Sequence, residues 1–129
     1  MVAAMSRAAA AGGAALAAAA VALGALGAHG LKETLRPEAL GWWQTAVQYQ
    51  MWNGLGLVAL GAGSFGRVGA PALLLAGGAA VFCTTLYAMA LGAPRWLGAV
   101  TPVGGALMVA GWSLLAYRLV TDRAGPPPS

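Results

Sequence analysis

The chain has 129 residues, of which 32 are alanine and 20 are glycine, and only ten carry a formal charge. Charged residues make up 8% of the chain, against about 25% in a typical soluble domain. A small domain needs many polar groups to cover its large relative surface, so this composition excludes an ordinary soluble domain. The hydrophobic fraction of 60% also excludes a disordered chain, which requires low hydrophobicity and high charge.

The charges divide the chain into four long uncharged stretches. These stretches cover residues 8–31, 39–66, 68–94 and 96–117, with lengths of 24, 28, 27 and 22 residues. A helix needs about 20 residues to cross the hydrocarbon core of a bilayer, and the ~10-residue alternating segments of membrane β-strands are not visible. The sequence therefore predicts an all-α integral membrane four-helix bundle, with residues 1–129 forming a single transmembrane domain.

The first stretch also has features of a signal peptide. Arg7 precedes an alanine-rich run, as in the charged and apolar regions of such a peptide. The run is longer than the typical signal core of about 7–15 residues. No small-x-small cleavage site ends it, because Leu26 stands where a small residue would be needed. We therefore favour a retained membrane helix over the alternative of a removed signal.

Prolines indicate where the other three helices begin, because proline is favoured at the first helical position. Pro37, Pro71 and Pro102 each stand near the start of an uncharged stretch, and Thr101 supplies an N-cap beside Pro102. The helices are expected near residues 8–28, 37–62, 71–92 and 102–120. Residues 124–129, with three consecutive prolines, are expected to form an exposed tail.

The short loops predict that consecutive helices pack as antiparallel neighbours, and an even number of helices places both termini on one side. Small residues permit close helix packing in lipid. Since residues 8–28 consist mostly of alanine and glycine, this helix is expected to touch several others. The side with the termini carries four basic residues and the other side three, so the positive-inside rule favours cytoplasmic termini.

The helix over 37–62 is the most polar of the four. Five of its polar residues cover about half of its circumference at ~100° per residue, whereas Gln50 lies off this arc. They are Gln44, Thr45, Gln48, Tyr49 and Asn53. Unpaired amides in hydrocarbon are costly, so the arc is expected to face other helices or a wet cavity. Two interpretations stay open: interhelical hydrogen bonding and a lined binding cavity.

The remaining chemistry excludes several kinds of function. His29 is the single histidine and Cys83 the single cysteine, so neither a pair of axial haem ligands nor a metal site within one chain is expected, and we expect no cofactor. His29 is interpreted as a helix C-terminal cap, with a proton-sensitive group as the alternative, and Cys83 as packing. The G-x-G-x-x-G pattern over 61–66 follows a membrane helix rather than a strand, so it does not indicate dinucleotide binding.

No nucleophile and base can be assembled from these residues, and no carboxylate lies at mid-depth of a predicted span. The chain is therefore expected not to be an enzyme or a proton-coupled pump. The absence of a basic cluster also argues against nucleic-acid binding.

Several segments resemble the YgdD-like family of small bacterial inner-membrane proteins, a family of unknown function with small eukaryotic transmembrane relatives. These segments are residues 25–32 (Ala-Leu-Gly-Ala-His-Gly-Leu-Lys), 45–51, 96–98, 101–105 and 111–112. The resemblance implies a four-helix, multi-pass protein of the bacterial plasma (inner) membrane with no established activity. The family often has His-Ala-Leu where this chain has Asn53-Gly54-Leu55. Asn53 cannot titrate near neutral pH, which argues against proton uptake at that position.

The predicted topology gathers polar residues at one face of the membrane. The helices over 8–28 and 71–92 end where those over 37–62 and 102–120 begin, and we expect any site at this face, on the extracytoplasmic side. The candidate residues are His29, Lys32, Gln44, Gln48, Tyr49, Asn53, Arg95, Trp96 and Thr101.

Two classes of function follow from these patterns. The favoured one is an accessory, structural or membrane-stabilising protein without catalytic activity, which acts by helix packing or partner contact. Its partners would be the lipid bilayer and a homo-oligomer or larger membrane complex. The alternative is an oligomeric small-solute transporter or channel that uses the polar face of residues 37–62. A water-filled cavity past Gln48 and Asn53 would favour the alternative, and a dry, closed bundle would argue against it.

Overall fold

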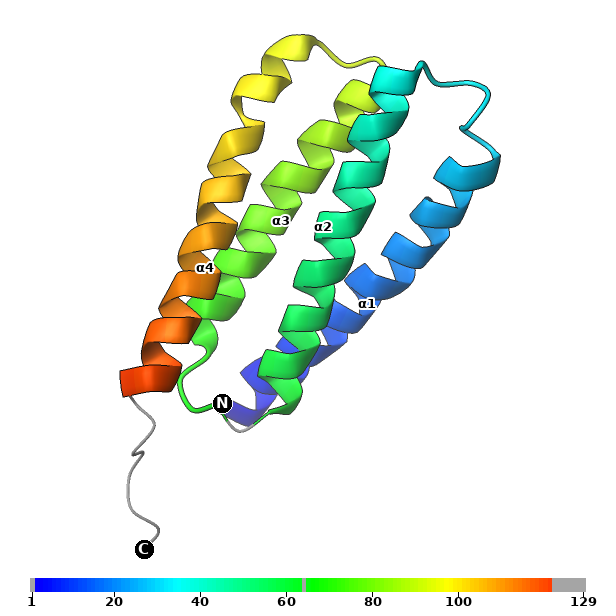
Figure 1. The fold of residues 1–129 in the computed structure, drawn as a ribbon. Coiled ribbons are helices and arrows are strands. Elements are labelled where there is room, and N and C mark those ends of the chain that lie inside the picture. The colour runs from blue at the N-terminus through cyan, green and yellow to red at the C-terminus, as the bar shows by residue number, and fades with distance from the viewer. Residues whose placement is uncertain (1, 64, 122–129) are drawn as a thin grey trace, which may run out of the picture.

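The computed structural model of the chain describes residues 2–63 and 65–121. Four α-helices follow one another: α1 (Val2–His29), α2 (Pro37–Ala62), α3 (Gly69–Ala90) and α4 (Thr101–Thr121), with a short 3-10 helix, η1 (Arg95–Ala99), before α4. Successive helices run antiparallel, and the start of α1 and the end of α4 lie at the same end of the bundle (Figure 1). The all-α architecture and the placement of the termini are as predicted. The expected tail over 124–129 lies outside the described residues.

The helix borders follow the local chemistry of the chain. α2 has the predicted bounds, with Pro37 at its N-terminus and Glu38 in its first turn, where an acidic side chain complements the helix dipole. α3 begins and ends two residues earlier than predicted. Its end is set by Gly92, which has φ +108° and donates to the Met89 carbonyl while Ala93 donates to Ala88. This is a Schellman motif, which requires the left-handed conformation that glycine adopts readily.

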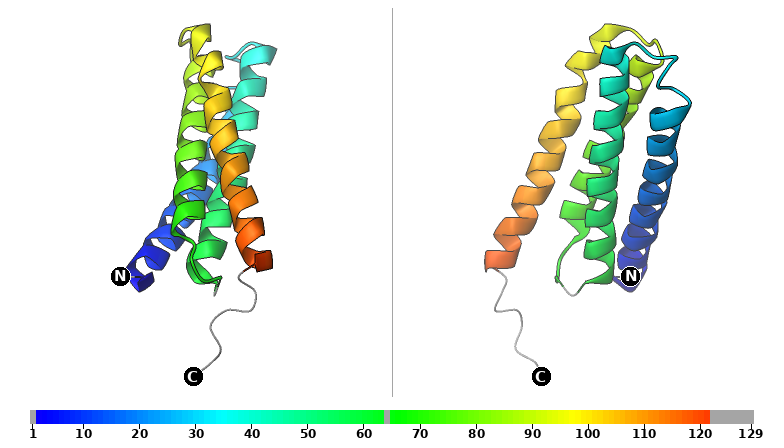
Figure 2. Two further views of the ribbon diagram at one scale, coloured as in Figure 1. Left: turned by 90° about the vertical axis from the view of Figure 1, so that its left-hand side faces the viewer. Right: turned by 45° about the vertical axis from the view of Figure 1, so that its right-hand side comes forward.

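The helices form three packed pairs in chain order. α2 packs against α1 on one side and α3 on the other, and α4 packs against α3. Within the described part of the chain, α1 has no interface of comparable size with α3 or α4, so the expectation that it touches several helices was wrong. The physical reason is its tilt: α1 crosses the other helices at an angle, and its N-terminal part diverges from them (Figure 2). The bundle is consequently open along one side of α1.

Three of the described helical segments are long and apolar enough to cross a membrane. They are Ser6–His29, Gly69–Ala90 and Arg95–Thr121, with hydropathies of 1.9, 1.8 and 1.5. α2 is long enough, at 26 residues, but its amides and aromatic residues make it more polar than the other three. α2 packs between α1 and α3, so it runs alongside two of these three segments. Four membrane spans were predicted, and three of the described helical segments are long and apolar enough to be membrane spans.

Glycines permit the closest contacts between helices. At the α1–α2 crossing, a Cβ atom on Gly54 would lie 2.9 Å from the Gly13 carbonyl oxygen and 3.1 Å from the Ala17 nitrogen. At the α3–α4 crossing, a Cβ on Gly78 would lie 2.7 Å from the Gly104 carbonyl oxygen. Both crossings are therefore backbone-to-backbone contacts, which in lipid gain most from van der Waals packing.

Candidate functional site

The end of the bundle opposite the termini carries the charged part of the predicted cluster. Arg95 of η1 forms an ion pair with Glu38 of α2 at 2.5 Å, and its guanidinium lies 5.5 Å from the centre of the Trp42 ring. Arg36 approaches the same carboxylate at 3.8 Å. These side chains are exposed, and pairs of this kind contribute at most about 1 kcal/mol in water.

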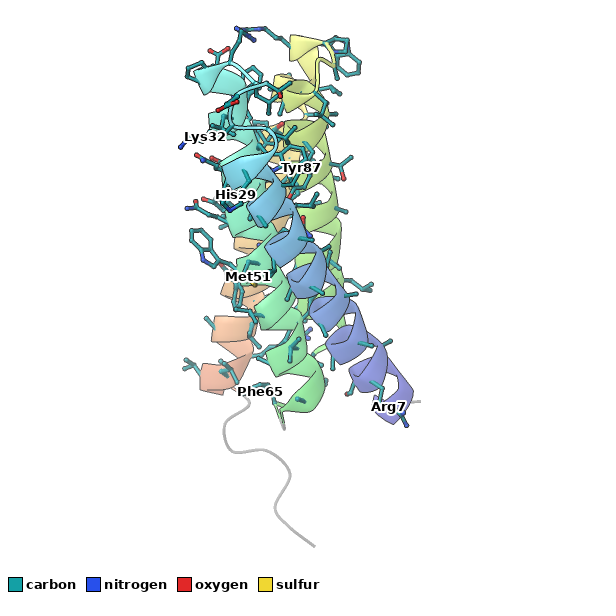
Figure 3. The ribbon with its side chains drawn as sticks, turned by 90° about the vertical axis from the view of Figure 1, so that its right-hand side faces the viewer. Arg7, His29, Lys32, Met51, Phe65 and Tyr87 are labelled. Carbon is teal, nitrogen blue, oxygen red and sulfur yellow. The ribbon has the colours of Figure 1, made fainter. Side chains whose placement is uncertain are left out.

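Three other candidates at this end point outward. His29 and Lys32 are exposed, and Figure 3 places them at the end opposite Arg7 and Phe65. Trp96 is 66% exposed. His29 stands in the last turn of α1, as expected of a group near a helix C-terminus. These candidates lie at one end of the bundle, where the structure brings Arg95 to Glu38 and leaves His29, Lys32 and Trp96 at the surface.

Thr101 connects α4 to α3 rather than lining a cavity. Its hydroxyl lies 2.7 Å from the Thr85 hydroxyl, and either oxygen can donate to the other. The hydroxyl that accepts donates its own proton to a carbonyl of its helix region, which is Leu97 for Thr101 and Val81 or Phe82 for Thr85. Both threonines are buried. Their hydrogen bond joins α3 and α4 near the end of the bundle opposite the termini, without exposing a reactive group.

The predicted polar arc of α2 divides into an inner and an outer part. Asn53 is 2% exposed and Tyr49 is half-buried, whereas Gln44 and Gln48 are exposed. Within the described residues, Asn53 of the arc bonds to α4, whereas Gln44 and Gln48 make no hydrogen bond to another helix. Side chains on the inner arc turn towards α3 and α4, and the adjacent helical row is left uncovered because α1 and α4 do not meet across it.

We call this uncovered row the outer face of α2. Its members recur at helical spacings of three, four or seven residues, which places them on one side of the helix. The outer face of α2 consists of Gly41, Gln44, Gln48, Trp52, Leu55 and Ala59.

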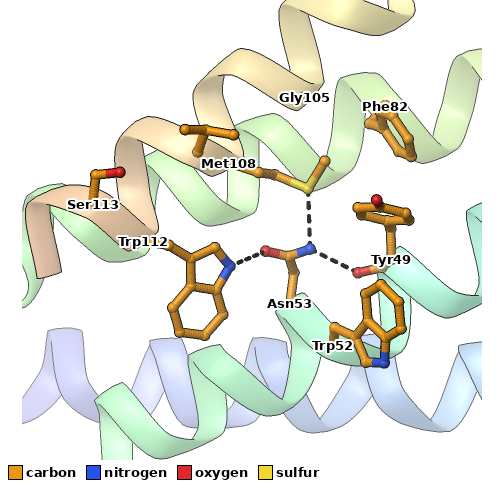
Figure 4. A pocket seen from close by; sticks show the side chains of 9 residues that line it. Tyr49, Trp52, Asn53, Phe82, Gly105, Met108, Trp112 and Ser113 are labelled. Atoms are coloured by element: carbon orange, nitrogen blue, oxygen red, sulfur yellow. Dashed lines mark hydrogen bonds between the residues drawn. The ribbon is translucent and has the colours of Figure 1, made fainter. Parts of the chain in front are cut away.

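Asn53 is the centre of the contact between α2 and α4. Its amide nitrogen donates to the Tyr49 carbonyl at 2.8 Å and lies 3.0 Å from the Met108 sulfur. Its amide oxygen accepts from the indole nitrogen of Trp112 at 3.2 Å, as Figure 4 shows. Trp112 fits there because Gly56, one turn beyond Asn53, has no side chain: a Cβ on Gly56 would lie 2.6 Å from the ring.

A groove of about 500 Å³ lies beside this amide, between α2, α3 and α4. Aromatic rings form much of its wall, with the Tyr49 ring packed on Trp52 and on Phe82. The amide and hydroxyl groups that line the groove belong to Asn53, Ser113 and Tyr49. Because the hydrogen bonds of Asn53 are directed to its own neighbours, the groove is mainly an apolar, aromatic surface.

Gln50 is a buried polar residue that lies outside the predicted polar arc of α2. Its amide nitrogen donates to the Leu16 carbonyl of α1 at 2.9 Å, and its oxygen accepts from the Tyr87 hydroxyl of α3 at 2.7 Å. It is 6% exposed and joins three helices. The available signal was its position on the same side as Trp43, Ala46 and Leu57, all of them buried.

We expect Gln50→Leu to lower the stability of the bundle by about 1 kcal/mol, because it breaks both interhelical hydrogen bonds and leaves the Tyr87 hydroxyl without an acceptor. Tyr87→Phe removes only one of these bonds and should cost less. Thermal unfolding of the purified protein in a mild detergent, followed by circular dichroism, compares the two variants. Equal midpoints for Gln50→Leu and wild type would contradict this assignment.

The interior is otherwise satisfied. Over residues 6–63 and 65–121, every buried side-chain nitrogen or oxygen has a hydrogen-bond partner. In the same residues no group of three or more His, Cys, Asp or Glu side chains is placed to hold a metal ion. Cys83 is buried, and its thiol donates to the Ala46 carbonyl at 3.3 Å. The arrangement can hold helices together, and its polar groups are engaged with one another.

Antiparallel membrane-length helices with an internally bonded polar core define a multi-pass helical membrane protein. The chain belongs to the family described as "Protein of unknown function (DUF423)", whose profile matches residues 23–105. A UPF0382 membrane protein of Staphylococcus haemolyticus is 42% identical over 106 residues, which cover 80% of this chain and 87% of the relative. The UPF0382 inner membrane protein YgdD of Escherichia coli K12 is 38% identical over 99 residues, or 74% and 76% of the two chains.

These relatives confirm the resemblance to the YgdD-like family and the multi-pass location in the inner (plasma) membrane. No solved structure matches the chain. The family match includes Gln44, Gln50 and Asn53, whereas Trp112, the donor to Asn53, lies beyond the matched residues.

Proposed function

We propose that this protein has no catalytic activity and works by contact inside the membrane, as an accessory or membrane-stabilising component of a complex. The observation that carries the proposal is the outer face of α2. Gln44 and Gln48 are exposed on it, and within the described residues neither side chain takes part in a hydrogen bond. We further propose that the termini are cytoplasmic, on the four-to-three difference in basic residues.

The depth of the two amides makes their exposure significant. α2 has 26 residues and a length of about 39 Å, against about 30 Å for the hydrocarbon core. With α2 centred in the bilayer, Gln44 lies about 6 Å inside the hydrocarbon and Gln48 about 12 Å inside. An amide transferred into a medium without hydrogen-bond partners costs about 4–8 kcal/mol. A partner that supplies donors and acceptors at this depth removes that cost.

The interior of the chain supports the same proposal. The buried amides of Gln50 and Asn53 are bonded to neighbouring helices of the same chain, and these bonds stabilise one arrangement of the helices. The amides of Gln44 and Gln48, on the outer face of α2, have no hydrogen-bond partner among the described residues. A chain built in this way is suited to adding a helix from another subunit beside α2.

Native mass spectrometry tests the proposal on the full chain extracted from membranes in a mild detergent. We expect a complex larger than one chain, and we expect the double variant Gln44→Leu/Gln48→Leu to lower its association constant about tenfold, as loss of about 1.4 kcal/mol would. Thr84→Leu is the matched control, because Thr84 is an exposed polar residue on α3. A wild-type protein that is wholly monomeric, or equal complex fractions in all three proteins, would contradict the proposal.

A small-solute transporter or channel is the second candidate, and the groove beside Asn53 is the observation that favours it. Stopped-flow swelling of liposomes that contain the wild-type protein decides between the two. We expect glycerol and urea to enter at the rate of protein-free liposomes, because the groove is lined largely by aromatic rings and its amide is engaged. Faster entry that Asn53→Leu abolishes would support the channel and overturn the contact proposal.

A further inference from the structure

We propose that the partner on the outer face of α2 is a second copy of this chain, which forms a parallel dimer about a two-fold axis normal to the membrane. This inference rests on the proposed function and names its partner. In this dimer, the outer face of α2, which lies between α1 and α4, packs against the outer face of α2 of the second copy.

The chemistry of the two glutamines favours a self-complementary contact. A carboxamide has two N–H donors and an acceptor oxygen, so Gln48 can both donate to and accept from Gln48 of a second copy. A two-fold axis normal to the membrane places identical residues at the same depth, where each amide finds its complement. Lipid tails offer neither donor nor acceptor. A threonine in the same place could bond to its own helix, as Thr85 does with Val81, but a longer amide has no such local partner here.

Gly41 is a second, independent feature of the same face. It lies within α2, where glycine is unfavourable relative to alanine, and its φ is not positive. A Cβ on Gly41 would meet nothing within 4 Å, so no contact inside the chain requires glycine. It lies seven residues before Gln48, which in turn lies seven before Leu55. A seven-residue repeat is the period of left-handed helix pairs, in which small residues allow close approach.

Charge is also compatible with a symmetric contact. In a two-fold interface, a charge near the axis meets the same charge of the other copy. Residues 39–66 contain no Asp, Glu, Lys or Arg, and Glu38 at the start of α2 is paired with Arg95. The outer face of α2 can therefore meet itself without repulsion. Trp52 and Leu55, each 54% exposed, add apolar area on the same side.

Cysteine cross-linking of the full chain in native membranes tests the dimer. The wild-type protein is its own background, because its single cysteine, Cys83, is buried and is expected to give no disulfide-linked species on mild oxidation. We expect Leu55→Cys and Ala59→Cys, both exposed on the outer face of α2, to give a species of twice the chain mass, with yields at least tenfold above two controls. The controls are Leu73→Cys on α3 and Val109→Cys on α4, which are exposed on other faces.

A second variant separates the contact from chance collision. Gln44→Leu on the Leu55→Cys chain removes an amide without touching the cross-linking position, and it should lower the dimer yield severalfold, whereas Thr84→Leu should not. Equal yields at all four cysteine positions would overturn the dimer, as would cross-linked species at position 55 whose mass is not twice that of the chain. The latter result would leave the proposed function standing with another partner. A native mass spectrum with monomer alone would end both proposals.

Discussion

Gly13→Ala is expected to destabilise the bundle by about 2–3 kcal/mol, whereas Gly12→Ala leaves it as stable as the wild type or slightly more so. A Cβ on Gly13 would lie 2.7 Å from the Val58 nitrogen and 2.8 Å from the Leu57 Cβ, and would press on the Gly54 carbonyl. The obstacle is backbone of α2, which cannot rotate away. A Cβ on Gly12 meets nothing within 4 Å.

The two changes are matched, because both glycines lie in the interior of α1 and both gain the same helix propensity from alanine. Thermal unfolding in mild detergent, followed by circular dichroism at the helix bands, measures the difference. We expect a clearly lower midpoint for Gly13→Ala alone. Gly54→Ala should behave like Gly13→Ala, since it faces the same crossing from α2. Equal midpoints for Gly12→Ala and Gly13→Ala would show that α1 can shift without cost.

The number and order of the helices could be predicted because hydrocarbon imposes a simple rule on sequence. Charges are excluded from the core and helices need a minimum length, so the spacing between Lys32, Glu38, Arg67 and Arg95 already outlines the spans. Proline and glycine then refine the borders, which is why α2 has its predicted bounds. α3 ends earlier than predicted because the turn at Gly92 depends on a left-handed conformation that composition alone does not specify.

The direction in which each polar residue points was harder to predict. Helical spacing shows which residues share a face, but the neighbour that covers this face depends on how the helices are arranged. Gln50 was placed outside the arc, yet it points to α1 and α3. Gln44 and Gln48 were placed on the arc, yet they are exposed because α1 and α4 leave that side of α2 open.

Asn53 shows the intermediate case. The spacing placed Asn53 and Tyr49 on the same arc as Gln44 and Gln48, and in the structure Asn53 is buried and Tyr49 half-buried. The sequence did not indicate that Trp112 would donate to the amide, because the two residues lie 59 positions apart. Their contact also requires Gly56, whose role follows only from the position of the indole ring. Contacts of this kind depend on the α3–α4 pair, since α3 holds α4 in place beside α2.

Gly104→Ala is expected to separate α4 from α3 and to destabilise the bundle by about 2–3 kcal/mol. A Cβ on Gly104 would lie 2.5 Å from the Phe82 nitrogen and 2.7 Å from the Gly78 carbonyl oxygen, so backbone again blocks it. Gly105→Ala is the matched control, because its Cβ would be in ordinary contact with the Phe82 ring at 3.8 Å. The same displacement would strain the hydrogen bond between Thr101 and Thr85.

Cys83 provides the measurement, because it is the single cysteine of the chain and its thiol is buried with a hydrogen bond to α2. A maleimide can react with it only when the helices open. If the free energy needed to open the bundle falls by about 2–3 kcal/mol, the population of the open state rises roughly thirtyfold to more than a hundredfold. We therefore expect labelling of Gly104→Ala to be faster by at least tenfold, with Gly105→Ala close to wild type. Equal labelling rates in the two variants would mean that the α3–α4 crossing does not limit opening of the bundle, and that the Asn53–Trp112 contact holds α4 in place without it.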